Sequence, residues 1–257
     1  MTEGILIRMI QSNPSLSEVG CIIFDEFHER SINSDLGLAL SLQIAEILRS
    51  DLRIIVMSAT LDVGSVSDLL DTKAPIISDG RAYPVNCEYL SRPRSKDDKL
   101  WENFAKLVSD AFEMTEGGIL AFLPGEAEIR ATEKLLKEKL PNSAIIMPLY
   151  GSLPFEQQNK ILEPLKDETF RKVVLSTSIA ETSLTISGIK VVVDSGYTRR
   201  SCYDPTTGMS RLITQKISKA EANQRMGRAG RVAAGWCYRN WAVSEESGMS
   251  EFPPSEI

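Results

Sequence analysis

The chain has 257 residues, a length that allows one large domain or two of modest size. Hydrophobic residues make up 42% of it and charged residues 25%, which is typical of a globular protein and excludes disordered and collagen-like chains. The net charge is −6, from 29 basic and 35 acidic residues. This balance argues against a protein that coats nucleic acid through its bulk charge, although a local basic surface is compatible with it.

The cysteines and the single histidine narrow the possible chemistry. The four cysteines are far apart, with no C-x-x-C pair, so we predict reduced thiols and neither a thiolate zinc site nor a disulfide framework. One histidine, His28, excludes a multi-histidine metal site. No apolar run approaches the ~18 residues of a membrane span, and residues 1–4 lack the basic start of a signal peptide. We therefore expect a cytoplasmic location.

Short β-branched runs alternate with amphipathic helical segments along the chain. A helix is expected from residue 34 to 49, with Ser34 as its cap, and another from 126 to 139. Alternation of this kind predicts an α/β fold. We expect parallel strands that are buried on both faces at residues 19–24, 53–57, 118–123, 173–175 and 191–193.

Residues 91–98 have no apolar side chain and contain Pro93, so we predict a linker between two lobes at this point. Further along, residues 197–218 contain a turn sequence at 204–208, flanked by alternating residues, which predicts a β-hairpin. The hairpin is locally basic, as a strand-separating element would be, but a generic surface hairpin is nearly as compatible with the sequence. Its basic residues are Arg199, Arg200, Arg211 and Lys216.

An acid pair follows the first predicted strand. Asp25 and Glu26 come directly after the apolar residues 21–24. An aspartate at the carboxyl end of a buried strand can hold Mg²⁺ through water, and the adjacent glutamate can activate a water for attack. For such a pair alone, the alternative that the acids cap the next helix is favoured. The assignment therefore needs support from elsewhere in the sequence.

Residues 224–231 provide that support. Arg228 and Arg231 are three residues apart, so a helical turn would direct both guanidinium groups to one phosphate. The alternative is a solvated basic helix. Such a helix would not need Gly227 and Gly230, each of which costs about 1 kcal/mol relative to alanine. We therefore predict a close approach of the backbone at these glycines.

Four segments resemble motifs II, III, V and VI of the DEAH-type superfamily 2 helicases, in the right order: residues 25–28, 58–60, 176–186 and 224–231. Phe27 and the residues at 29–31 and 193–196 are most similar to a bacterial branch of that family. The resemblance implies two RecA-like lobes with parallel sheets. Residues 1–90 would be the carboxy-terminal part of the first lobe (motifs Ib, II and III), 91–98 the linker, 99–241 the second lobe (motifs IV, V and VI) and 242–257 the start of a truncated winged-helix region.

The resemblance also implies a role for each matching residue. Asp25 and Glu26 would bind Mg²⁺, with Glu26 activating a water that Gln224 orients, while Arg228 and Arg231 compensate the charge of the transition state. His28, Ser58 and Thr60 would couple phosphate state to lobe movement. Contacts to ATP would come from Leu162, Ser183 and Thr185, and contacts to nucleic acid from Thr2, Gly125 and Thr177. Two departures stand out: Ser187 replaces the acid that meets the ribose in the family, and Leu162 replaces an adenine-stacking phenylalanine.

These motifs imply the core of an ATP-dependent RNA or DNA helicase, with Mg²⁺ as cofactor, ATP as substrate and single-stranded or partly duplex nucleic acid as partner. No G-x-x-x-x-G-K-[ST] loop occurs in the sequence, so the first lobe is expected to be incomplete at its N-terminus and the chain alone to hydrolyse ATP negligibly. The alternative is a stand-alone module that binds RNA or a partner protein without turnover. An AAA-type or transport ATPase is disfavoured, because motifs V and VI belong to the tandem-lobe superfamily.

Overall fold

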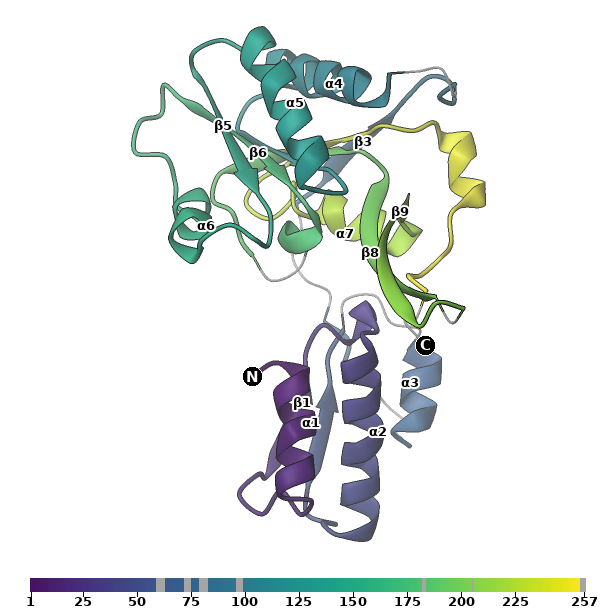
Figure 1. The fold of residues 1–257 in the computed structure, drawn as a ribbon. Helices are drawn as coiled ribbons and strands as arrows, with labels where there is room; N and C mark the ends of the chain where they lie inside the picture. The colour runs from purple at the N-terminus through teal and green to yellow at the C-terminus, as the bar shows by residue number, and fades with distance from the viewer. Residues whose placement is uncertain are drawn as a thin grey trace. The chain divides into compact units, whose positions relative to one another are not determined.

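The computed structural model describes residues 1–58, 63–71, 75–78, 83–95, 99–181, 184–204 and 206–254. The chain divides into two compact units, one of residues 1–79 with 253–257 and one of residues 80–252. Figure 1 labels the helices and strands of the two units. In the described part of the chain, no helix is both long and apolar enough to span a membrane.

The first unit has two parallel strands packed against helices. The strands β1 (Cys21–Phe24) and β2 (Arg53–Val56) pair with Cys21 opposite Arg53. The helices are α1 (Glu3–Ser12), α2 (Ile32–Ile47) and α3 (Val63–Leu69), with a short 3₁₀ helix η1 (Phe27–Glu29) after β1. Leu6 of α1 and Leu38 of α2 share one hydrophobic core with Phe24 of β1. Helices and strands thus form two layers.

Two sequence predictions for this unit are wrong in detail. In β1 the side chains of Ile22 and Phe24 are buried, but Ile23 between them is 56% exposed, so this strand is not buried on both faces. Among the described residues, the core that contains α1 and α2 includes only one face of β1. The cap of α2 is Ser31, whose side chain accepts a hydrogen bond from the backbone N–H of Ser34, because a cap must precede the first helical residue.

The second unit is built on a sheet of six parallel strands in the order β3-β10-β7-β4-β6-β5. This arrangement confirms the predicted α/β fold with a parallel sheet. The strands are β3 (Val85–Tyr89), β4 (Gly118–Phe122), β5 (Ala144–Leu149), β6 (Arg171–Ser176), β7 (Ile189–Asp194) and β10 (Gly235–Arg239). The helical elements are α4 (Leu100–Met114), α5 (Glu126–Lys139), α6 (Phe155–Leu162), η2 (Ser178–Ala180), α7 (Lys219–Gly227) and η3 (Val243–Gly248).

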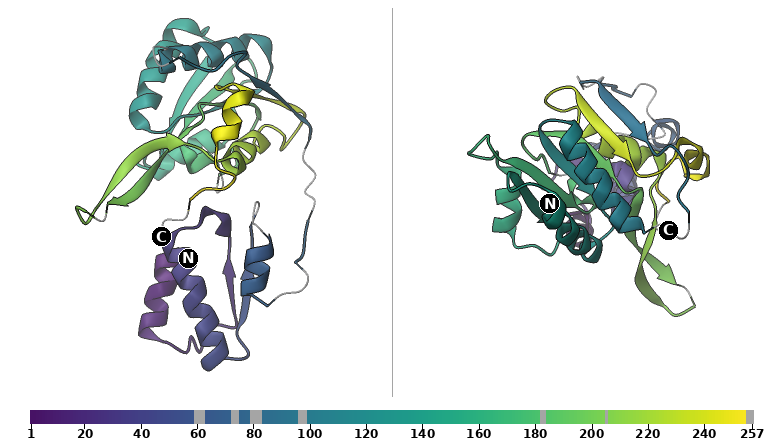
Figure 2. Two further views of the ribbon diagram at one scale, coloured as in Figure 1. Left: turned by 90° about the vertical axis from the view of Figure 1, so that its right-hand side faces the viewer. Right: turned by 90° about the horizontal axis from the view of Figure 1, so that it is seen from above.

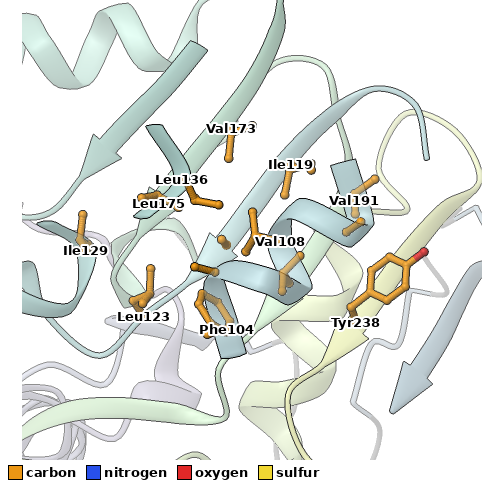
Figure 3. Close-up of a cluster of buried hydrophobic side chains, with 14 of the residues drawn as sticks. Phe104, Val108, Ile119, Leu123, Ile129, Leu136, Val173, Leu175, Val191 and Tyr238 are labelled. Atoms are coloured by element: carbon orange, nitrogen blue, oxygen red, sulfur yellow. The ribbon is translucent and has the colours of Figure 1, made fainter. Parts of the chain in front are cut away.

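The central strands of this sheet are buried on both faces, as predicted for parallel strands. Because successive side chains of a strand point to opposite faces, Ile119 and Leu120 of β4 belong to two different hydrophobic clusters. The first cluster contains Phe104 of α4 and Ile129 of α5, as Figure 3 shows. The second contains Ile161 of α6. The unit is therefore a three-layer sandwich, with helices on both faces of the sheet.

The boundary between the units differs from the expected one. We expected residues 1–90 in the first lobe, but β3 pairs with β10 in the second unit, with Cys87 opposite Cys237. Residues 91–95 of the expected linker then connect β3 to α4 inside that unit, and residues 96–98 lie outside the described part of the chain. Composition marks a break in regular structure at this point, but it does not reveal with which strand β3 pairs.

The predicted hairpin is confirmed. Strands β8 (Tyr197–Asp204) and β9 (Met209–Lys216) pair in antiparallel fashion and project from the second unit (Figure 2). The positive charge of the hairpin is offset, however, because each of its four basic side chains has an acidic partner within 3.5 Å. The pairs are Arg199–Glu128, Arg200–Glu221, Arg211–Asp204 and Lys216–Glu245.

Candidate functional site

The acid pair lies in a tight loop at the carboxyl end of β1. The carboxylate of Asp25 accepts a hydrogen bond of 2.9 Å from the backbone N–H of Glu26. The next N–H, of Phe27, donates to the carbonyl oxygen of Met57 at 3.0 Å, and the N–H of Met57 donates to Phe24. The loop is thereby joined to the end of β2, where Ser58 follows. Thr60, which like Ser58 was expected to couple the phosphate state to lobe movement, lies outside the described residues.

The side chain of Glu26 does not serve as a helix cap. Glu26 precedes η1 with a left-handed backbone (φ 51°), which is uncommon for a residue with a side chain, and its carboxylate makes no capping hydrogen bond. Instead, its Oε2 atom lies 3.4 Å from Nε2 of His28, whose side chain is only 6% exposed. The structure therefore gives no support to the capping alternative and holds Glu26 beside His28.

The residues of this loop fit a magnesium ion. Asp25 is exposed and the Glu26 side chain is 35% exposed, so both carboxylates are accessible from solvent. Mg²⁺ in nucleotide sites is usually held by one or two carboxylates, water and the phosphates of the substrate. Within the described ranges, no group of three or more His, Cys, Asp and Glu side chains is placed to hold a metal ion.

In the second unit, Arg228 and Arg231 contact the same segment. Helix α7 starts at a capping box between Ser218 and Glu221 and ends at Gly227, and the next residues continue in tighter turns. Nη1 of Arg228 donates to the carbonyl oxygen of Leu184 at 2.9 Å. Nη1 of Arg231 donates to Oγ1 of Thr185 at 2.7 Å. Residues 184–185 and 228–231, which belong to two different sequence motifs, therefore form one cluster.

The two glycines of this segment behave differently. A Cβ atom on Gly230 would lie 2.6 Å from the carbonyl oxygen of Tyr83 and 2.9 Å from Val85, so the predicted close approach of the backbone is present there, against the start of β3. At Gly227 nothing lies within 4 Å of the same position. The backbone of Gly230 therefore packs closely against the start of β3, whereas the backbone of Gly227 makes no such close approach.

Another residue expected to contact ATP, Leu162, is joined by its backbone to the segment that follows residues 184–185. Leu162 ends α6, and its carbonyl oxygen accepts a hydrogen bond of 3.1 Å from the backbone N–H of Ser187. The two positions at which the sequence departs from the family therefore contact each other. Gln224 is half-buried on α7, and Ser183 lies outside the described residues.

Arg225, for which the sequence suggested no role, is fully buried. Its guanidinium forms ion pairs with Glu181 and, at 2.8 Å, with Asp194, and it lies over the ring of Phe122. Burial works against the charged form of Arg225, but the two carboxylates outweigh it and raise its pKa. Burial raises the pKa of Glu181 to about 7, and Arg225 opposes this only in part. Arg225 adjoins the motif residue Gln224, but no local pattern reveals its buried partners.

The residues expected to contact nucleic acid differ in accessibility. Thr2 is exposed at the start of α1, where its side chain makes no capping hydrogen bond. In the second unit, Thr177 is half-buried after β6. Gly125 is buried at the start of α5, where the guanidinium of Arg199 covers the position that a Cβ would occupy. Of the three residues expected to contact nucleic acid, Gly125 is thus the one that is buried in this conformation.

Comparison with known proteins decides the family. The model of the helicase conserved C-terminal domain matches residues 99–233. The chain is 45% identical over 237 residues to the ATP-dependent RNA helicase HrpB of Escherichia coli, which covers 91% of this chain and 29% of that protein. A crystal structure described as the DEAH/RHA helicase HrpB of E. coli covers 100% of this chain with a TM-score of 0.91 and 42% identity. The chain belongs to the DEAH-box helicases.

Within the DEAH-box helicases, the bacterial branch expected from the sequence is confirmed as one close to HrpB. The pre-mRNA-splicing factor prp22 of Schizosaccharomyces pombe, another ATP-dependent RNA helicase, is 41% identical over 265 residues. This match covers 100% of the chain and 22% of prp22. The chain thus spans less than a third of the length of these relatives.

Proposed function

We propose that this chain is the core of an ATP-dependent RNA helicase that couples hydrolysis of ATP to movement along a strand. One observation carries the proposal: Arg228 and Arg231 both donate hydrogen bonds to residues 184–185, which brings the two motif segments together. Support also comes from the relatives, which are ATP-dependent RNA helicases by name. The substrate is ATP, the cofactor Mg²⁺ and the partner single-stranded or partly duplex RNA.

In this proposal the first unit supplies the acid–base chemistry. Glu26 accepts a proton from the attacking water, and its carboxylate is positioned beside His28. Asp25 would hold Mg²⁺, and the bound ion would neutralise charge on the phosphate oxygens. Because Glu26 is partly exposed, a water molecule can reach its carboxylate.

The second unit supplies electrostatic stabilisation. Arg228 and Arg231 donate to the phosphoryl group as its charge develops, and Gln224 orients the water. A guanidinium has five N–H donors in a planar fork. Arg231 is exposed and uses Nη1 for its hydrogen bond to Thr185, so its fork is accessible to a phosphate. Residues 184–185 would then hold both arginines in place.

A second candidate function rests on one feature of the sequence. The 257 residues contain no phosphate-binding G-x-x-x-x-G-K-[ST] loop, which favours a module that binds nucleic acid or a partner protein without turnover. ATP hydrolysis by the chain, with and without single-stranded RNA, separates the two functions. We expect RNA binding with negligible turnover from these residues alone, and turnover from a protein that carries them together with the loop. Absence of turnover in that longer protein would favour the binding module.

Variants of the longer protein test the roles of the residues. Glu26→Gln should abolish turnover and leave ATP affinity nearly unchanged, because it removes the base but keeps the shape. Arg228→Lys and Arg231→Lys should each lower kcat sharply, because lysine keeps the charge and loses the planar fork. Arg130→Lys, at an exposed position of α5, is the matched control. If turnover survives Arg→Lys and RNA binding is weaker after Arg→Ala, these arginines contact the nucleic-acid strand instead of the phosphoryl group of ATP.

A further inference from the structure

A small pocket with cationic walls lies in the second unit, away from the arginine cluster. It has a volume of about 240 Å³, and its charged lining consists of Arg92, Arg94, Lys106 and Asp110. Three cations against one acid leave an excess of two positive charges. The volume is below the range of about 300–1,000 Å³ that is typical of sites for drug-sized ligands. The pocket therefore fits a small anionic group and not a whole nucleotide.

Two side chains of this pocket carry buried donors without a partner. Asn240 is 1% exposed, and its Nδ2 atom has no hydrogen-bond partner among the described residues. In the same part of the structure, Nη1 of Arg94 is buried and also lacks one. The guanidinium of Arg94 lies 5.2 Å from the centre of the Tyr197 ring, which holds it in place. Because a buried donor without a partner costs free energy, both groups favour a ligand that accepts hydrogen bonds.

The position of the pocket indicates the source of this ligand. Leu90 and Asn240 directly follow the neighbouring strands β3 and β10, so the pocket lies at the carboxyl edge of the parallel sheet. Thr177, one of the residues proposed to contact nucleic acid, follows β6 at the same edge. Four strand spacings separate β3 from β6, or roughly 19 Å along the edge. A single strand that runs along this edge would pass both positions.

We propose that this pocket binds a phosphate group of the nucleic-acid backbone, with Arg94 and Asn240 as its donors. A phosphate offers several acceptor oxygens, which a guanidinium can engage in pairs. Contacts of this kind fix the strand and read no base identity, as a motor that passes over any sequence requires. The inference rests on the proposed function, since it takes a nucleic acid as the ligand.

The experiment measures binding of a fluorescein-labelled oligouridylate to the 257-residue chain by anisotropy, over a series of salt concentrations. Arg94→Gln should weaken binding about tenfold and reduce the slope of log K against log salt by about 0.7, the value for one phosphate contact on a single strand. Asn240→Asp, which keeps the shape of the side chain and adds a negative charge, should weaken binding at least as much. Lys134→Gln, at an exposed position of α5 outside the pocket lining, removes the same charge as Arg94→Gln and is the control.

Thermal melting of each variant shows whether it is folded, and Arg94→Gln keeps the test decisive if Asn240→Asp does not fold. If Arg94→Gln changes affinity and slope no more than Lys134→Gln does, the inference is overturned and the proposed function stands. If the unmodified chain does not bind the oligouridylate, the proposed function fails together with the inference. Titration with inorganic phosphate distinguishes the source of the anion. A shift of the Asn240 amide resonances with inorganic phosphate, but not with the oligouridylate, would overturn the assignment to the backbone.

Discussion

Replacement of Arg225 by methionine should strongly destabilise the second unit. Arg225 is 0% exposed and forms ion pairs with the side chains of Glu181 and Asp194, which are 9% and 1% exposed. Methionine fills much of the same volume but leaves two carboxylates in the core without their counter-ion. Breaking a buried ion pair in this way costs about 3–5 kcal/mol. At about 2–4 °C per kcal/mol for a domain of this size, the melting temperature should fall by roughly 6–20 °C.

The assay is urea unfolding followed by tryptophan fluorescence. All three tryptophans of the chain, Trp101, Trp236 and Trp241, belong to the second unit, so the signal reports on the unit that contains the substitution. Arg130→Met is the matched control. Arg130 is 62% exposed and pairs with Glu126, so its loss should cost no more than about 1 kcal/mol.

A second substitution tests the cause of the effect. Glu181→Gln in the Arg225→Met background removes one of the two carboxyl groups that have lost their counter-ion and should recover roughly 1–3 kcal/mol, a coupling typical of residues in direct contact. The reasoning is refuted if Arg225→Met costs no more than Arg130→Met. It is also refuted if Glu181→Gln makes the Arg225→Met variant less stable, because the loss would then come from packing and not from buried charge.

Three further outcomes are expected. The pKa of Glu181 is about 7 in the folded protein, against an ordinary 4.5, so its contribution to the free energy of unfolding falls as the pH rises from 4.5 to 7. Glu181→Gln should therefore make the free energy of unfolding, measured with urea, less dependent on pH in this range. A hydrogen bond with the Cys237 thiol lowers the pKa of Cys87 from 9.0 to about 7. The rate at which iodoacetamide alkylates Cys87 should therefore rise with pH with a midpoint near pH 7, and Cys237→Ala should move this midpoint to higher pH. Gly230→Ala, whose Cβ would meet a backbone oxygen at 2.6 Å, should cost about 1–3 kcal/mol in urea unfolding, whereas Gly227→Ala should cost nothing.

The sequence by itself determined the class of fold. Apolar β-branched runs such as residues 118–123 predicted parallel strands, and the turn at 204–208 predicted the hairpin, because these signals lie within a few residues of one another. The acid pair after β1 was assigned a role only together with residues 224–231, because for such a pair alone a helix-capping role is favoured. Local periodicity carries this information because it reflects which face of an element is buried.

Only the tertiary structure decided which distant residues meet. Arg225 and Glu181 are 44 residues apart, and the strand order of the sheet brings them together in the core. The same holds for β3, whose partner β10 follows about 150 residues later. It also holds for Arg199 and Arg200 of the hairpin, whose charges are offset by acids of α5 and α7. Composition counts charges without showing which of them are paired. Pairing depends on the order in which strands assemble, and that order is set by the packing of the whole unit and not by any single segment.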